Sequence, residues 1–155
     1  MIIDDLEITG ALQISLNDEI VHQCDNLVVT AGKNWVASRF KDTVGGGFTQ
    51  KAEMSHMALG TSGTAAAVGN TALTAEISAS RIALTTDGGT VSNATVQYDA
   101  TWTSSHGAYA IQEAGIFNHA TAGHADCDML ARTVFAVINK GTDDTVSISW
   151  TITVS

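Results

Sequence analysis

The sequence predicts an all-β protein: an antiparallel β-sandwich of jelly-roll-like type, with about eight strands and one short helix. The most direct evidence is the run from 145 to 154, in which apolar residues alternate with serine and threonine, as in a strand with one face in a core. Similar short runs recur along the chain, and no regular alternation of strands with helices accompanies them. A length of 155 residues suits a single domain, 1–155, and we expect its last strand to be paired inside the fold.

The N-terminal segment is expected to form a β-hairpin. Apolar residues alternate with polar ones between 6 and 16, with Gly10 as the interruption. Asn17 and Asp18 supply turn residues, and 20–30 reads as the returning strand. Segment 1–30 is therefore a candidate hairpin or arm for assembly with a partner.

The only helix should follow this hairpin. It is expected to begin near Thr30, a candidate N-cap, and to end near Phe40. Its apolar stripe consists of Trp35, Val36, Arg39 and Phe40, and a helix of two or three turns must pack on a sheet to be stable. The glycines at 45–47 predict a loop of high backbone entropy and a second candidate for a contact arm.

The remaining elements are read from apolar runs and turn residues. A loop is expected at 61–74 and a turn at 87–89. Strands are predicted at 55–60, 81–86, 95–103, 110–118, 129–138 and 145–154.

Composition excludes several classes of protein. Sixteen acidic residues against seven basic ones give a net charge of −9, which disfavours direct binding to nucleic acid. No run of apolar residues is long enough to span a bilayer, and no basic segment begins a signal peptide, so no membrane contact is expected. The two cysteines, Cys24 and Cys127, are expected to remain thiols, and proline is absent.

No catalytic motif is evident, and we expect neither an enzyme nor a cofactor. The densest set of metal-ligand residue types contains His119, His124, Asp126, Cys127 and Asp128. A second pair of ligands at suitable spacing is lacking, so a polar loop is the primary interpretation and a metal held on a symmetry axis of an oligomer is the alternative. The segment Gly60–Thr64 does not have the spacing of a nucleophile elbow.

Three charged residues, Arg81, Glu113 and Arg132, lie inside otherwise apolar strand-like segments. Because an unpaired buried charge is costly, we expect Glu113 to pair with Arg81 or Arg132 and to fix strand register or a subunit contact. The alternative is that each side chain points to solvent. Candidate interface anchors are Trp35, Trp102, Tyr109 and Trp150, although Trp102 and Trp150 are equally suited to the core.

Several blocks resemble small β-sandwich virion proteins of tailed phages. These blocks are N-L-V-V-T-A-G-K-N-W-V-A at 26–37, H-M-A-L-G-T-S-G-T-A-A-A at 56–67, E-A-G-I-F-N at 113–118 and L-A-R-T-V-F-A-V-I-N-K at 130–140, with the terminal run at 145–154. The resemblance is to capsid decoration (cement) proteins and head-fibre proteins, and also to the N-terminal regions of tail-collar fibre proteins. It implies a structural role without a cofactor.

The favoured expectation from this resemblance is a decoration protein. Such a protein would be made in the host cytoplasm, form a homotrimer, and bind the major capsid protein on the outer surface of the virion. No repetitive shaft follows the domain within the 155 residues, which favours decoration over a fibre. The alternatives are a tail or baseplate fibre or adaptor protein and, more distantly, a carbohydrate-binding module.

Overall fold

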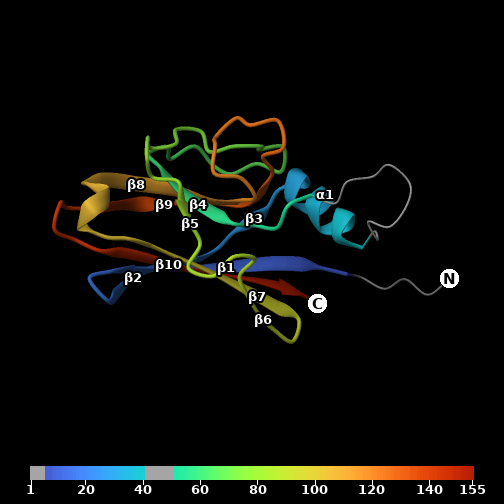
Figure 1. Ribbon diagram of the computed structural model, residues 1–155. Coiled ribbons are helices and arrows are strands. Elements are labelled where there is room, and N and C mark those ends of the chain that lie inside the picture. The colour runs from blue at the N-terminus through green and yellow to red at the C-terminus, as the bar shows by residue number, and fades with distance from the viewer. Residues whose placement is uncertain (1–5, 41–50) are drawn as a thin grey trace.

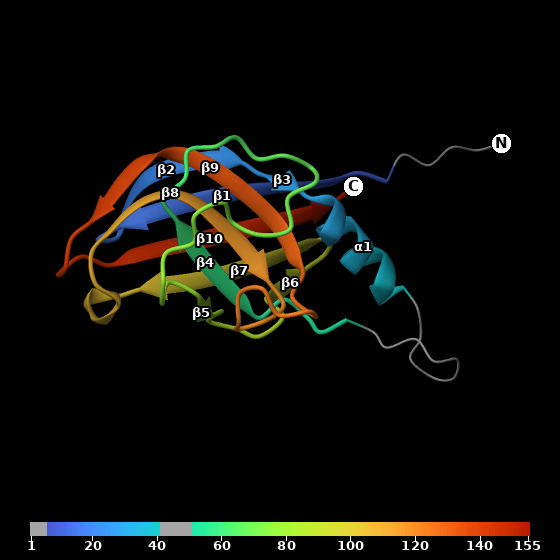
Figure 2. The same cartoon turned by 90° about the horizontal axis from the view of Figure 1, so that it is seen from above.

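The computed structural model describes residues 6–40 and 51–155 and confirms an all-β antiparallel sandwich (Figure 1). Two five-stranded sheets stack face to face, and one helix lies at one end of the sandwich (Figure 2). The first sheet has the order β2-β1-β10-β7-β6, and the second has the order β3-β9-β8-β4-β5. The elements are β1 (Ile8–Leu16), β2 (Glu19–Asp25), β3 (Leu27–Val28), α1 (Thr30–Arg39), β4 (His56–Gly60), β5 (Ile82–Ala83), β6 (Thr90–Ser92), β7 (Thr95–Trp102), β8 (Tyr109–Phe117), β9 (Met129–Lys140) and β10 (Val146–Val154).

The predicted N-terminal hairpin is confirmed. Strands β1 and β2 are joined by Asn17 and Asp18, whose φ angles of 50° and 67° suit a two-residue hairpin turn. Strand β1 lies inside the first sheet and β2 at its edge, so residues 8–28 belong to the body of the sandwich. Any arm formed by residues 1–5, or by the glycines at 45–47, lies outside the described residues.

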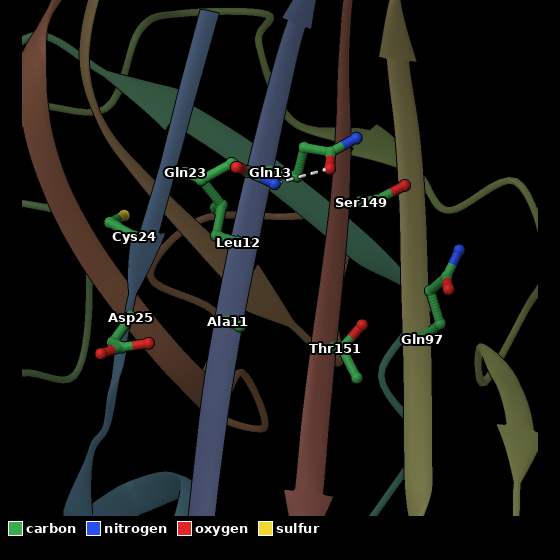
Figure 3. Close-up of a pocket in the computed structure, with 9 residues that line it drawn as sticks. All are labelled: Ala11, Leu12, Gln13, Gln23, Cys24, Asp25, Gln97, Ser149 and Thr151. Carbon is green, nitrogen blue, oxygen red and sulfur yellow. Dashed lines mark hydrogen bonds between the residues drawn. The ribbon is translucent and has the colours of Figure 1, made fainter. Parts of the chain in front are cut away.

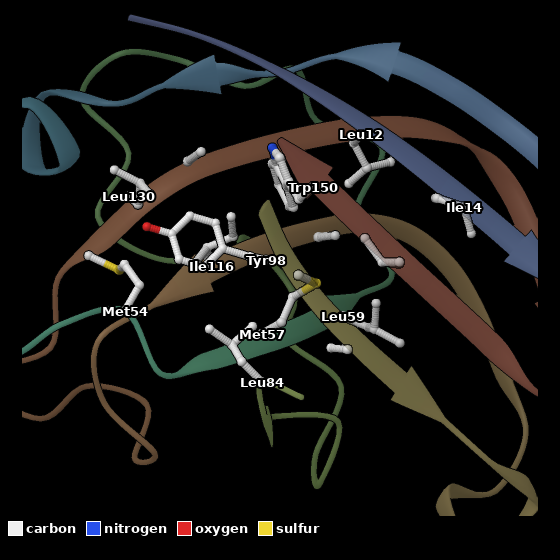
Figure 4. Packing of buried hydrophobic residues seen from close by; sticks show 14 of the residues in the cluster. Leu12, Ile14, Met54, Met57, Leu59, Leu84, Tyr98, Ile116, Leu130 and Trp150 are labelled. Atoms are coloured by element: carbon white, nitrogen blue, oxygen red, sulfur yellow. The ribbon is translucent and has the colours of Figure 1, made fainter. Parts of the chain in front are cut away.

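The C-terminal strand β10 occupies the centre of the first sheet, as expected. It pairs with β1 on one side and with β7 on the other. Its apolar residues face the second sheet and its serines and threonines face outward, as the alternation in the sequence predicts. The core between the sheets includes Leu12, Ile14, Met57, Leu59, Tyr98, Ile116 and Trp150 (Figure 4).

The returning strand, predicted as one element over 20–30, is divided at Asn26. Before this residue β2 pairs with β1, and after it β3 pairs with β9 in the other sheet. The Asn26 side chain accepts a hydrogen bond from Trp150 Nε1 at 2.6 Å and lies against Gly10, where an added Cβ would be 1.9 Å from Asn26 Oδ1. Gly10 thus leaves room for the corner at which the chain changes sheets.

Two other differences concern short strands. Strand β6 was not predicted, and the strand expected at 81–86 is reduced to β5. Together with the division at Asn26, β6 raises the strand number from the predicted eight to ten.

The helix lies at the predicted place, but two of its details differ from the prediction. Val29, not Thr30, is the N-cap and forms no side-chain cap, while the Thr30 amide binds the Val68 carbonyl at 2.8 Å. Phe40, expected on the buried stripe, is 78% exposed because it lies just beyond the last helical turn. Within the described residues, no helix is long and apolar enough to cross a membrane.

Candidate functional site

The outer face of the second sheet is covered by two long segments, 61–81 and 118–128 (Figures 1 and 2). A second apolar cluster lies on the side of this sheet away from the main core, and Leu73 joins it from the first of these segments. Most of 61–76 consists of glycine, alanine, serine and threonine, which offer little apolar area for packing. Polar contacts with arginine side chains therefore do much to hold these segments to the sheet. We call these two segments the roof.

The first of these arginines is Arg132 on β9, which forms a buried ion pair with Glu113 on the neighbouring strand β8. Both side chains are 0% exposed, and Arg132 Nη2 lies 2.7 Å from Glu113 Oε2. The Glu113 carboxylate also accepts the backbone N–H groups of Thr74 and Ala75 at 3.0 and 2.7 Å. Glu113 thus pairs with Arg132, one of its two predicted partners, and neither side chain points to solvent.

The guanidinium of Arg132 has an acceptor for every N–H group. Its Nε donates to Glu113 at 2.8 Å. The four N–H groups on the terminal nitrogens donate to Thr64 O, Ala65 O, Asn70 Oδ1 and Thr74 Oγ1 at 2.9–3.3 Å. One buried side chain therefore fixes four points of the roof to the sheet.

Arg81 forms the second contact, with a partner that the sequence did not indicate. Its guanidinium binds both carboxylate oxygens of Glu76 at 2.7–2.9 Å and stacks 3.7 Å from the centre of the Phe117 ring. It also donates to His119 O and to Cys127 Sγ, and so joins the two roof segments. Burial lowers the pKa of Arg81, but the contacts with Glu76 and Cys127 outweigh it, so the pKa is raised and the group stays charged.

The residues of the predicted polar loop contact other groups of the same chain. The rings of His119 and His124 stack at 3.9 Å, and each Nδ1 accepts a backbone N–H, from Thr121 and Asp126 respectively. Asp128 binds Lys51 Nζ at 2.6 Å. Over residues 6–40 and 51–155, no group of three or more His, Cys, Asp or Glu side chains is arranged to hold a metal ion. A metal shared between copies stays a prediction.

The candidate aromatic anchors are mostly internal. Trp102 and Trp150 are fully buried between the sheets, which is the core role that the alternation also allowed. Trp35 is 9% exposed and donates its indole N–H to Ala52 O at 2.7 Å, so it holds α1 to the following segment. Tyr109, at the start of β8, is half-buried.

One buried charge was missed altogether. Lys140 is 2% exposed, and its Nζ donates to Gly107 O at 2.7 Å and to Gly141 O at 3.2 Å. The sequence holds a signal for it, because Lys140 is two residues from buried Ile138 and shares its face of β9.

The outer face of the first sheet carries no such cover among the described residues. Strand register places small and polar side chains in rows across β2, β1, β10 and β7, for example Gln13, Ser149 and Asp99 in one row. We call this surface the open face. Its outward side chains are Thr9, Ala11, Gln13, Ser15, Gln23, Asp25, Thr95, Gln97, Asp99, Thr101, Ser147, Ser149, Thr151 and Thr153.

A shallow hollow lies at the centre of the open face (Figure 3). Ala11, Ser149 and Thr151 form part of its floor, and longer side chains, including those of Gln13 and Gln23, surround them. Gln23 Nε2 donates to Gln13 Oε1 at 3.0 Å across the β1–β2 pair. This hydrogen bond links the two amide side chains beside the hollow.

Comparison of the chain with protein-family models, with curated proteins and with solved structures found no match. The evidence on function therefore comes from the arrangement of the sheets and side chains. Its main feature is an asymmetry: one sheet is roofed by segments that two arginines hold in place, and the other presents a broad polar face.

Proposed function

We propose that this chain is a structural protein of a phage particle, a decoration protein that binds the major capsid protein on the outside of the shell as a homo-oligomer. The identity of the particle is drawn from the resemblance of the sequence blocks. The observation that carries the structural role is the asymmetry of the two sheets. A sandwich with one broad face that no other described residue covers suits assembly with other subunits.

The side-chain chemistry supports a role without catalysis. The charged groups buried on the roofed side are paired or fully hydrogen-bonded. The histidines at 119 and 124 accept backbone N–H groups, and the described residues of the open face include no histidine. None of these groups forms the nucleophile–base–orienter arrangement that acyl transfer or hydrolysis requires.

The same observations disfavour the carbohydrate-binding module. Sugar rings are commonly held by exposed aromatic faces, and the open face has no aromatic side chain among its described residues. The three tryptophans are internal. A tail or baseplate adaptor would use the same rigid body, so position on the particle must separate this alternative from decoration.

Immunogold labelling of intact particles, with antibody raised against the purified chain, makes that separation. Gold distributed over the head is expected for a decoration protein. Gold confined to the neck or tail would replace this proposal with the adaptor. Particles that remain unlabelled, while the denatured particle proteins react in a blot, would place the chain inside the shell; no reaction in either assay would refute a virion role.

A further inference from the structure

We propose that the open face is the surface through which one copy of this chain binds a second copy. The inference deepens the assembly role proposed above and rests on it. It names both the surface and the partner, whereas the resemblance implied a homotrimer and indicated no surface. A face that packs on an identical face forms a two-fold interface, so the inference is of a dimer.

Charge is the first reason for choosing a second copy as the partner. Each chain carries a net charge of −9, so two copies repel one another over most orientations. The open face carries no lysine or arginine and only two carboxylates, Asp25 and Asp99. Asp99 accepts hydrogen bonds from Gln97 and from Ser149, which disperse its charge. Approach through this face therefore costs little electrostatic energy.

The chemistry of the side chains is the second reason. Hydroxyl and amide groups both donate and accept hydrogen bonds, so a surface of serine, threonine and glutamine complements an identical surface. A face of carboxylates or of lysines would instead require a partner of opposite charge. The small side chains on β10 allow a facing sheet to approach closely, and bridging waters can fill the shallow hollow.

Area is the third reason. Strands about 4.8 Å apart, with about 3.3 Å per residue along each, give the four strands of the open face an area of roughly 500 Å². A standard stable interface takes about 800 Å² from each partner. The open face thus supplies most of the area that self-association needs, and Ile20, which lies opposite outward-facing Ser15 and is 57% exposed, extends it with apolar surface.

The test places one positive charge at the centre of the face. Thr151→Arg introduces a long charged side chain on central strand β10, where a facing copy would have to bury it. Thr121→Arg is the matched control, because the same change falls on an exposed residue of the roof. Analytical ultracentrifugation from micromolar to millimolar concentration measures the association of both variants and of the unchanged chain, and thermal melting verifies that each is folded.

The unchanged chain and Thr121→Arg are expected to associate alike, and Thr151→Arg to associate about tenfold more weakly or not at all. If Thr151→Arg does not fold, Gln13→Arg tests the same surface from β1, where a long side chain is already present. An unchanged chain that is monomeric throughout the range would overturn the inference. So would equal association of the face variant and the roof variant.

The outcome is separable from that of the proposed function. A monomeric chain whose antibody labels phage heads would overturn self-association and leave decoration in place. A chain that self-associates through the open face, but gives no labelling and no reaction in the blot, would support self-association and refute the virion role.

Discussion

Removal of the Arg132 side chain tests whether the buried ion pair holds the roof to the second sheet. Arg132→Met keeps a long apolar side chain but abolishes the ion pair and every hydrogen bond of the guanidinium. Glu113 then keeps only the two backbone N–H groups of Thr74 and Ala75 as partners for a carboxylate that is 0% exposed. Breaking such a pair on one side costs about 3–5 kcal/mol in the free energy of unfolding.

That loss is a large part of the total stability, which for a domain of this kind is about 5–15 kcal/mol. Urea unfolding followed by tryptophan fluorescence measures it, since Trp102 and Trp150 are in the core. Arg39→Met is the matched control: within the described residues this exposed arginine donates a hydrogen bond to Lys51 O and lies 5.5 Å from the centre of the Trp35 ring. Its loss should change stability by about 0.5 kcal/mol. A loss below about 1 kcal/mol for Arg132→Met, or one equal to the control, would refute the reasoning.

Hydrogen exchange supplies a second, local readout of the same variant. The Thr74 and Ala75 amides donate to Glu113 and should exchange slowly in the unchanged chain. In Arg132→Met they should exchange faster, while amides of central strand β10 keep their protection under native conditions. Equal acceleration at both places would indicate a global loss of stability without local release of the roof.

Three further predictions concern the core and pH. Gly10→Ala places a Cβ against Asn26 Oδ1 and should lower the free energy of unfolding by about 1–3 kcal/mol. Gly69→Ala is the control, because no atom lies within 4 Å of its added Cβ, and it should have little effect. Equal melting temperatures for the two variants would contradict this prediction. Burial holds the pKa of His56 below 6.5, so the unfolded chain takes up that proton first. Stability should therefore fall as pH drops below 6.5, and the fall in the urea midpoint should be smaller in His56→Gln; an identical fall would rule out this contribution. Burial raises the pKa of Tyr98 from 10.0 to about 12, so its contribution to stability is complete below pH 10.0 and is lost as pH rises toward 12. Ultraviolet titration of the folded chain should detect this late ionisation, and ionisation of Tyr98 near pH 10 would contradict it.

The sequence predicted those elements whose pattern is local. The alternation in β10 placed its apolar residues in the core, and the Asn17-Asp18 turn fixed the hairpin of β1 and β2. The change of sheet at Asn26 could not be found in this way, because 20–30 reads as one strand. It depends on contacts with Gly10 and Trp150, which are distant in sequence.

The ion pairs, too, could be predicted from the sequence only in part. The expectation that Glu113 pairs with a buried arginine follows from the cost of an unpaired charge and is confirmed. The choice of Arg132 over Arg81 depends on the path of segment 61–81, which brings Glu76 to Arg81 instead. That path is set largely by hydrogen bonds to backbone N–H and C=O groups of the segment, a type of partner that no residue pattern displays.

The composition of the roof explains why buried charge is retained in this fold. A segment of glycine, alanine, serine and threonine cannot attach itself to a sheet by apolar area, and Leu73 is its one contribution to the outer apolar cluster. A guanidinium with five donors in a fixed plane can instead bind several carbonyls of an irregular segment at once. Arg132 and Arg81 thus keep the second sheet covered while the first stays open. We infer that this difference, among the residues that the structure describes, leaves one broad sheet face uncovered for contact with other subunits.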